Sequence, residues 1–304
     1  MPSSQSDRQH SLRGILFMCA ATIILFPLMN AAVKYLGGEG YPIVQIVFFR
    51  SLIHFLWMVA LFLPTQGWRI FVTNRPALQL GRSVLQLIAL TTYVIGVRHI
   101  PLSTAAGVGF TAPLLVVVLS VPLLGEKVGP RRWAAVFVGF IGALVIIRPG
   151  TEVFQPANFF ILAAAFSYAL YQILTRRVSE HDDYRVTGVY TIFASLAIST
   201  ILVGFDWKTP DSGLDWLILL TLGIVGGGGH FFMIRAYQYG EASVLGPLDY
   251  GQLLGATLLG YLIFAEFPDL WTWVGAGIII ASGLYIARRE SIKRHEAIKS
   301  LPAE

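Results

Sequence analysis

Long apolar runs, separated by short polar links, follow one another along nearly the whole chain. Each is about as long as the roughly 20 residues that an α-helix needs to cross the hydrocarbon core of a membrane. The predicted spans are residues 14–36, 43–63, 77–97, 102–124, 131–148, 157–176, 186–205, 214–236, 242–265 and 270–287. The pattern predicts an all-α integral membrane protein with ten transmembrane helices, whose function resides within the membrane because no link is long enough to form a soluble domain.

The second half of the chain repeats the first. Shifts of 140 and 142 residues superimpose matching positions without gaps. The matched pairs are Ser103 with Ser243, Glu126 with Glu266, Trp133 with Trp273, Asn30 with Gln172 and Lys34 with Arg176. The division predicts a first repeat of five spans over residues 1–150 and a second over residues 151–304. Because five is odd, the second copy must cross the membrane in the opposite sense, which gives two inverted five-helix repeats of the kind found in transporters.

The composition supports a bilayer protein, with 55% hydrophobic and 13% charged residues against about 25% charged in soluble domains. Most of the 22 lysine and arginine residues fall in one alternate set of loops and in the two tails. The exceptions are Lys34, Arg98, Arg148 and Lys208 in the other loops, and Arg50 and Arg82 within spans. Since short basic loops stay in the cytoplasm, both termini are predicted to be cytoplasmic. The basic residues form no single patch, which argues against a nucleic-acid partner.

Motifs for catalysis and cofactor binding are missing. The chain has one cysteine, Cys19, and no His-Glu-x-x-His helix, phosphate-binding glycine loop or pair of carboxylates inside the spans. We therefore expect neither an enzyme nor a bound cofactor or metal. A membrane-embedded acyl- or phosphotransferase is one alternative, and a channel is another, although no ring of like charges is visible.

Several stretches resemble the EamA domain of the drug/metabolite transporter superfamily. They are Phe48-Phe49-Arg50, Ala105 through Pro113 to Leu124-Gly125-Glu126, Trp133, the glycine-rich fifth span ending at Gly150, and in the second half Ala265-Glu266 and Trp273. The second copy departs from the first where Ala265 replaces the glycine and Leu253 stands in the place of Pro113. The resemblance covers residues 14–287. It implies a multi-pass secondary carrier of the bacterial inner membrane, working by alternating access as a monomer or homodimer on a small solute, with S-adenosylmethionine, riboflavin and amino acids as candidates.

Charged and titratable groups inside the spans are the first candidates for function, because they are costly to bury in a membrane. They are Arg50, His54, Arg82, His230 and Asp249. We expect the two arginines to contact substrate and His54, His230 and Asp249 to take part in proton coupling. Structural alternatives are an anchoring role for Arg50, and for Arg82 either an extension to the headgroups or a static pair with Asp249.

Amide, amine and aromatic side chains complete the predicted substrate site. Asn30 and Lys34 share a helix face, as do Tyr168 and Gln172, and Gln86 lies one turn beyond Arg82. The aromatic candidates for stacking on a flat or cationic solute are Tyr93, Phe110 and Tyr250.

Glycine spacing leaves two interpretations open. The pairs Gly223/Gly227 and Gly251/Gly255 allow close helix packing, including dimerisation, and the run 226–229 allows either bending or close packing.

Overall fold

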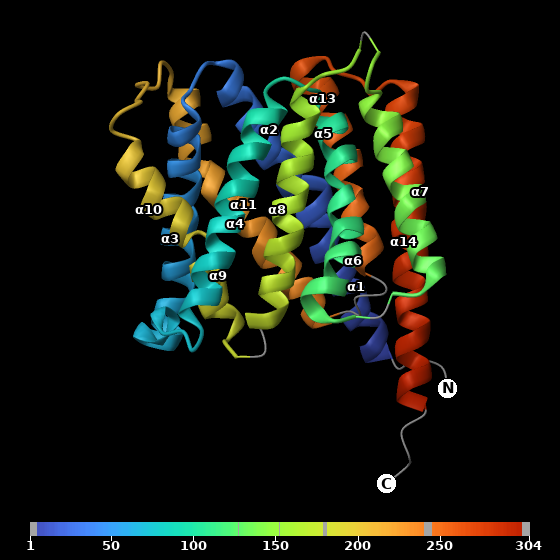
Figure 1. Ribbon diagram of the computed structural model, residues 1–304. Helices are drawn as coiled ribbons and strands as arrows, with labels where there is room; N and C mark the ends of the chain where they lie inside the picture. The colour runs from blue at the N-terminus through green and yellow to red at the C-terminus, as the bar shows by residue number, and fades with distance from the viewer. Residues whose placement is uncertain (1–4, 127, 152, 179–180, 240–244, 300–304) are drawn as a thin grey trace.

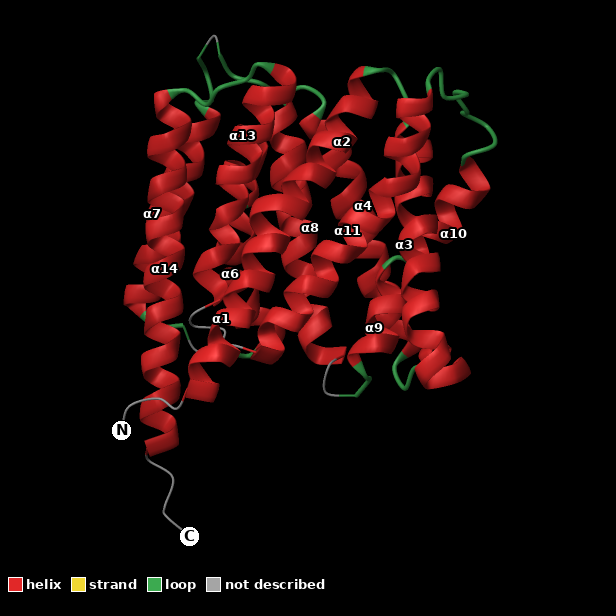
Figure 2. Cartoon of the chain, turned by 180° about the vertical axis from the view of Figure 1, so that it is seen from behind, coloured by secondary structure: helices red, strands yellow, loops and turns green. Residues whose placement is uncertain are grey.

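The computed structural model describes residues 5–126, 128–151, 153–178, 181–239 and 245–299, and the described chain consists of helices and loops (Figures 1 and 2). Nine helices in these ranges are long and apolar enough to cross a membrane, and a shorter apolar segment, Leu248–Phe264, accompanies them. That segment lies in the predicted ninth span, whose first residues, 242–244, fall outside the described ranges. The all-α membrane architecture is confirmed, with ten spans as an approximate count.

The first repeat contains five apolar spans, of which the first and fourth are built from more than one helical segment. Its elements are α1 (Gln5–Cys19), η1 (Ala20–Leu25), α2 (Phe26–Gly38), α3 (Ile43–Gln66), η2 (Gly67–Phe71), α4 (Pro76–Val97), α5 (Leu102–Gly109), α6 (Thr111–Leu124) and α7 (Pro130–Ile147). The second repeat follows the same plan, but its second span is divided. Its elements are α8 (Ala157–Val178), α9 (Tyr184–Thr191), α10 (Phe193–Leu202), α11 (Gly213–Tyr239), η3 (Gly246–Gly251), α13 (Gln252–Phe264) and α14 (Leu270–Lys299).

The fifth spans of the two repeats, α7 and α14, lie side by side in opposite directions (Figure 1). Arg148 directly follows α7, and its Nη2 lies 2.5 Å from Oδ2 of Asp269, which directly precedes α14. Further along, a Cβ atom on Gly142 would lie only 2.7 Å from the carbonyl oxygen of Gly275. Glycine at both positions therefore lets the helix axes approach closely, and the antiparallel pairing is the one that inverted repeats require.

Contacts between the halves also occur in matched pairs. Helix α4 packs along α8, and its repeat counterpart α11 packs along α1, η1 and α2. Likewise α6 packs against α8, while its counterpart α13 packs against α2. The two halves therefore interlock through matched contacts that involve the first, third and fourth spans of each.

Apolar side chains cover the outside of the bundle, whereas several polar ones are enclosed. Phe137 is 69% exposed and Ile201 is 68% exposed, but Arg82 and Gln79 are fully buried. This distribution suits a protein surrounded by lipid, where the outer face loses nothing by being apolar and interior polar groups need protein partners.

The glycine-rich part of α11 is a packing surface. The helix is continuous from Gly213 to Tyr239, and a Cβ atom on Gly223 would lie 2.5 Å from the backbone nitrogen of His54 on α3. On α13, a Cβ atom on Gly255 would overlap the carbonyl oxygen of Ile23. Both glycine pairs thus face neighbouring helices of the same chain, which favours close packing over bending and leaves these faces unavailable for dimerisation.

Candidate functional site

The fourth span is interrupted at the same level in both repeats. In the first, α5 and α6 are separated at Phe110, because Pro113 has no backbone N–H to donate to the carbonyl of Gly109. In the second, the 3₁₀ segment η3 ends beside Tyr250, the position that the 140-residue shift matches to Phe110. The two rings meet edge to face with centroids 5.0 Å apart. Matched interruptions near the membrane midplane are a recurring feature of transporter binding sites.

The first span is also irregular beside this level. Its η1 segment is a π-helix, and Pro27 cannot donate to the carbonyl of Ile23. The hydroxyl of Thr22 donates to the carbonyl of Met18 at 2.9 Å and to that of Leu248 at 3.0 Å. This side chain ties the irregular first span to the interrupted ninth one, and π-helical turns of this kind concentrate at functional sites.

A cavity of about 230 Å³ lies between the repeats where these irregular segments meet. It is lined by residues of α2, α3, α4, α5, α6, α8, α11, η3 and α13. Its polar lining consists of Asn30, Arg50, Gln86, Tyr93, Tyr168, Gln172, His230, Asp249 and Gln252. With the exception of Gln252, these are side chains that the sequence analysis names as site candidates, and Phe110 joins them as an aromatic wall.

Arg50 is the dominant charge in the cavity. It is 8% exposed, and its Nε atom has no hydrogen-bond partner among the described residues. The side chains close enough to interact with its charge include Tyr93, Tyr168 and the two histidines His54 and His230. The Arg50 guanidinium lies near the α11 backbone, since a Cβ atom on Gly226 would lie 3.7 Å from Arg50 Nε, an ordinary contact distance. The result is a buried cation at the cavity wall with bonding capacity left for an anion.

Asp249 is the single carboxylate among the described residues that line the cavity. It lies on η3, and the amide of Gln252 one turn further on hydrogen-bonds to it. Gln252 is not among the residues predicted from the sequence. Its spacing of three residues from Asp249 is the signal that would have indicated it. The pair offers an acceptor group on the side of the cavity formed by the second repeat.

The two candidate histidines stack on each other behind Arg50. Their ring centroids are 6.0 Å apart with an interplanar angle of 17°, and the His230 ring meets Phe26 edge-on at 5.1 Å. His230 lines the cavity, but His54 does not, and the Nε2 atom of His54 has no hydrogen-bond partner within the described ranges.

Neighbouring tyrosines on α8 face different environments. Tyr168 lines the cavity with Gln172, one turn further along. Tyr171 stacks on Tyr168 with centroids 5.5 Å apart, but its hydroxyl accepts a hydrogen bond from Arg82 Nη1 at 3.0 Å. On the facing α4 helix, the Gln86 Oε1 atom is buried and has no partner in the described structure, so it can accept a hydrogen bond from a solute.

Arg82 lies outside the cavity, in a hydrogen-bonded network beside the break between α9 and α10. It is fully buried. Its acceptors are the Gln79 amide oxygen, the hydroxyls of Tyr171, Thr175 and Thr191, and the carbonyl of Thr187. It therefore neither extends to the headgroups nor pairs with Asp249, the two structural alternatives considered for it, but supports the divided second span of the second repeat.

Asp182, in the loop before α9, is linked to this network through Gln79. Burial alone raises the pKa of Asp182, but hydrogen bonds from Thr73, Asn74 and Gln79 outweigh it and lower the pKa below its ordinary value. The Gln79 amide donates to Asp182 at 2.9 Å and accepts from Arg82 at 3.3 Å. The Asp182 carboxylate is therefore linked to the buried Arg82 through Gln79 and compensates part of its charge.

Lys34 also lies away from the cavity, in an ion pair between the repeats. Its Nζ atom is 2.5 Å from Glu266 Oε2 and donates to the carbonyl of Ile100 at 2.8 Å. The repeat-matched positions form a second pair at the opposite end of the bundle, where Arg176 Nη1 lies 2.5 Å from Glu126 Oε1. Each pair joins the first span of one repeat to the end of the fourth span of the other.

The family model for EamA-like transporters matches the chain twice, over residues 12–148 and 155–288. The chain belongs to the EamA-like transporter family. An S-adenosylmethionine uptake transporter of Rickettsia felis is 30% identical over 267 residues, which cover 87% of this chain and 90% of that one. A riboflavin transporter of Vibrio cholerae is 28% identical over 291 residues, covering 95% and 97%. One solved structure shares the fold, with a TM-score of 0.61, 20% identity and coverage of 94% and 99%.

Membership of the EamA-like family confirms the predicted family, and the relatives support a secondary transporter of a small metabolite over an enzyme or channel. In this transporter the cavity brings together residues from both repeats. The roles of the thirteen candidate residues remain predictions, and the geometry separates those that reach the cavity from Lys34, His54 and Arg82, which do not. Tyr250 lies at its edge, against Phe110.

Proposed function

We propose that this EamA-like transporter carries an organic solute with an acidic group across the bacterial inner membrane through the central cavity. The observation that supports it best is Arg50, a buried cation whose Nε atom has no described partner and whose neighbours include Tyr93 and Tyr168. An uncompensated buried charge is costly. A carboxylate or phosphate of the solute removes that cost and gives the cavity its selectivity.

The cavity chemistry favours a solute that combines an anion, a cation and a flat ring. Arg50 binds the anion, Asp249 binds a cationic group or a proton, and Tyr93, Tyr168 and Phe110 stack on the ring. S-adenosylmethionine and amino acids carry a carboxylate and a cationic group, whereas riboflavin carries neither. Among the solutes for which the relatives are named, S-adenosylmethionine is the better match.

Alternating access follows from the two matched ion pairs. Lys34–Glu266 closes the end of the bundle near Ile100, and Arg176–Glu126 closes the opposite end. The repeats, residues 1–150 and 151–304, rock against each other so that one pair separates while the other stays formed. The solute passes through unchanged, which distinguishes transport from the turnover of an enzyme.

The test uses purified protein and three named probes: S-adenosylmethionine, riboflavin and methionine. A solute at 100 times its dissociation constant stabilises the protein by about 2.7 kcal/mol, which a thermal-unfolding screen detects. Arg50→Gln should abolish this stabilisation, because a charge-assisted hydrogen bond is worth about 1.5–3 kcal/mol, and Arg50→Lys should restore part of it. Wild-type binding by Arg50→Gln contradicts the proposal.

Uptake into proteoliposomes separates binding from coupling. Asp249→Asn should bind the solute but lose the dependence of transport on a pH gradient, because the side chain can no longer take up a proton. Release of a chemically altered solute would instead support the enzyme alternative.

The proposed orientation places both termini in the cytoplasm, as the start of α1 and the end of α14 lie at the same end of the bundle (Figure 1). In a Cys19→Ser background, Thr209→Cys should react with an impermeant thiol reagent added to intact cells, whereas Trp68→Cys should react only after lysis. The reverse pattern contradicts this topology.

A further inference from the structure

The fifth span of the second repeat, α14, supplies none of the described residues that line the central cavity, yet it contacts an aromatic side chain at the cavity's edge. Gly283 on α14 is buried, and a Cβ atom there would overlap the phenol oxygen of Tyr250. The ring carbon that bears this oxygen would lie 2.9 Å from the same Cβ atom. The Tyr250 hydroxyl therefore occupies the volume that a larger side chain at residue 283 would need.

Tyr250 supports one wall of the cavity. Its ring meets the Phe110 ring edge to face, with centroids 5.0 Å apart and an interplanar angle of 82°. Phe110 lines the cavity, and so do Asp249 and Gln252, which are close to Tyr250 in the chain. Because protein interiors are close-packed, a Tyr250 ring displaced from α14 would move against Phe110 and towards the cavity.

The first repeat has a complementary pair of residues at the matched positions. The 140-residue shift matches Tyr250 to Phe110 and Gly283 to Ala143. Phe110 lacks the hydroxyl of Tyr250, whereas Ala143 has the methyl group that Gly283 lacks. Phe110 and Ala143 are both buried in the main hydrophobic core. Each repeat thus carries only one of the two groups, as is expected where a hydroxyl and a methyl group compete for the same volume.

We propose that Gly283 is a positioning residue that allows the transporter to accept a solute with a flat ring. The space beside Gly283 receives the Tyr250 hydroxyl, which holds the Tyr250 ring away from the cavity and keeps the Phe110 side open for stacking. A methyl group at residue 283 would press Tyr250 against Phe110 and narrow that side. This role rests on the proposed function, in which the acidic group of the solute binds Arg50 on α3 and should be little affected.

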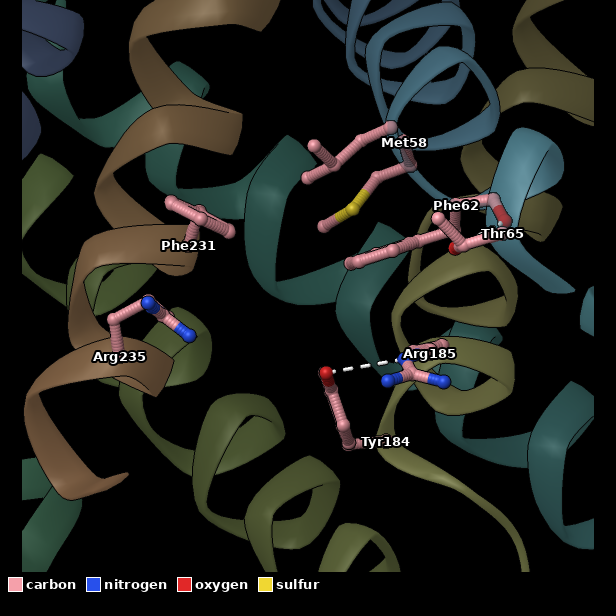
Figure 3. Close-up of a pocket in the computed structure, with 8 residues that line it drawn as sticks. Met58, Phe62, Thr65, Tyr184, Arg185, Phe231 and Arg235 are labelled. Carbon is pink, nitrogen blue, oxygen red and sulfur yellow. Dashed lines mark hydrogen bonds between the residues drawn. The ribbon is translucent and has the colours of Figure 1, made fainter.

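A second cleft provides an internal reference. It lies between the end of α3, the start of α9 and the last turns of α11, with Met58 and Phe62 on one wall and Phe231 on another (Figure 3). None of its described lining residues lines the central cavity or belongs to α14. Leu61 also lines this cleft. Leu61→Trp, which fills it, should therefore leave solute binding unchanged.

Equilibrium binding to the purified transporter tests the proposal with two solutes. S-adenosylmethionine carries an adenine ring, and methionine carries the same carboxylate and amino group without that ring. Since a change of one methylene group in a pocket alters recognition by roughly 10- to 200-fold, we expect Gly283→Ala to weaken S-adenosylmethionine binding at least about tenfold and methionine binding less than about twofold. Gly277→Ala, at an exposed position of α14 where a Cβ atom would have no neighbour within 4 Å, should change neither.

A double substitution distinguishes positioning from a general loss of folding. Gly283→Ala with Tyr250→Phe reproduces the phenylalanine–alanine pair of the first repeat, and it should recover most of the lost affinity because the competing hydroxyl is gone. Failure of this rescue, or an equal loss for both solutes in Gly283→Ala, overturns the proposal. If Gly283→Ala alone aggregates, the double variant decides, since aggregation or weak S-adenosylmethionine binding in that variant also overturns it.

A measurement without solute separates this role of Gly283 from the proposed function. In a Cys19→Ser background, Ala106→Cys places a thiol on the cavity lining one turn before Phe110, and its reaction with a small thiol reagent is timed. Gly283→Ala should slow this reaction about tenfold, which corresponds to about 1.4 kcal/mol, and adding Tyr250→Phe should restore it. An unchanged rate overturns the proposal whatever the solute. The expected change of rate in a protein that binds neither solute overturns only the proposed function.

Discussion

The two ion pairs between the repeats occupy matched positions but have different surroundings. The Lys34 side chain is 8% exposed and bonds both Glu266 and the carbonyl of Ile100. The Arg176 side chain, paired with Glu126 at the opposite end, is 63% exposed. The two repeats thus place an ion pair at matched positions at both ends of the bundle. The burial of the cation differs between the two pairs, and so should their contribution to stability.

The difference has an energetic consequence. An exposed ion pair contributes roughly 0–1 kcal/mol, because water and salt screen it. The Lys34 ammonium group is buried and donates to both Glu266 and the carbonyl of Ile100, and a hydrogen bond that involves a charged group contributes about 1.5–3 kcal/mol. If the pairs close the two ends during transport, the end held by Lys34 is the harder one to open.

The largest predicted effect follows from this comparison. Lys34→Gln should destabilise the protein by about 3 kcal/mol, since it removes a buried ammonium group that donates to both Glu266 and the carbonyl of Ile100, whereas Arg176→Gln should cost less than about 1 kcal/mol. Unfolding in the same detergent, followed by circular dichroism, measures both. Equal losses in the two variants would show that the matched pairs are energetically equivalent.

Charge reversal sharpens the same comparison. Arg176→Glu with Glu126→Arg should restore most of the wild-type stability, because the exposed pair keeps opposite charges at the same two positions. Lys34→Glu with Glu266→Lys should recover only part of it, because a carboxylate at residue 34 would face the carbonyl oxygen of Ile100. Full recovery at residue 34 would mean that the Ile100 contact contributes nothing.

A second contrast separates the second spans of the repeats. Helix α3 is continuous, whereas its counterpart is divided at Ile192 between α9 and α10. The Ser83 hydroxyl oxygen accepts from the backbone N–H of Ala194 at 2.7 Å, and Arg82 bonds the carbonyl of Thr187. Side chains of α4 thus form hydrogen bonds with backbone groups beside the break between α9 and α10. Asp182, linked through Gln79, balances the charge of Arg82.

The hydrogen bonds of Asp182 make the stability of this region dependent on pH. Its pKa is lowered in the folded protein, so the stabilisation is fully present above the unfolded value of about 3.9 and is lost as pH falls through the lower native value. Asp182→Asn should cost about 2 kcal/mol at neutral pH, within the range for a charged hydrogen-bonding group. Its thermal-unfolding difference from wild type should disappear at low pH, and a difference that is constant with pH would contradict the assignment.

The smallest effect concerns the residues before the two paired glutamates. Gly125 and Ala265 both adopt left-handed backbone conformations, with φ of 69° and 55°. In both, the next amide bonds a carbonyl six residues earlier, a helix-ending motif that favours glycine. Ala265→Gly should stabilise the protein by about 1 kcal/mol, and Gly125→Ala should destabilise it by a similar amount, as urea unfolding would show. Effects of the same sign at both positions would contradict the matched geometry.

Much of the site could be predicted from sequence because intramembrane polar groups are few. Arg50, Asp249 and Gln172 were selected for that reason, and all three line the cavity. The same reasoning could not place Lys34 or Arg82, since both have the chemistry of a binding residue, and only their partners show that they are bonded within the protein.

The sequence by itself determined the membrane class, the approximate spans, the duplication and the family, because each is written in local hydrophobicity and in matched residues along the chain. Only the tertiary structure decided which polar groups share a cavity. A helical period places Asn30 and Lys34 on one face, yet Asn30 lines the cavity and Lys34 pairs with Glu266. The packing of the two repeats brings together partners more than 200 residues apart, such as Lys34 and Glu266. The local pattern of residues does not predict such a pair.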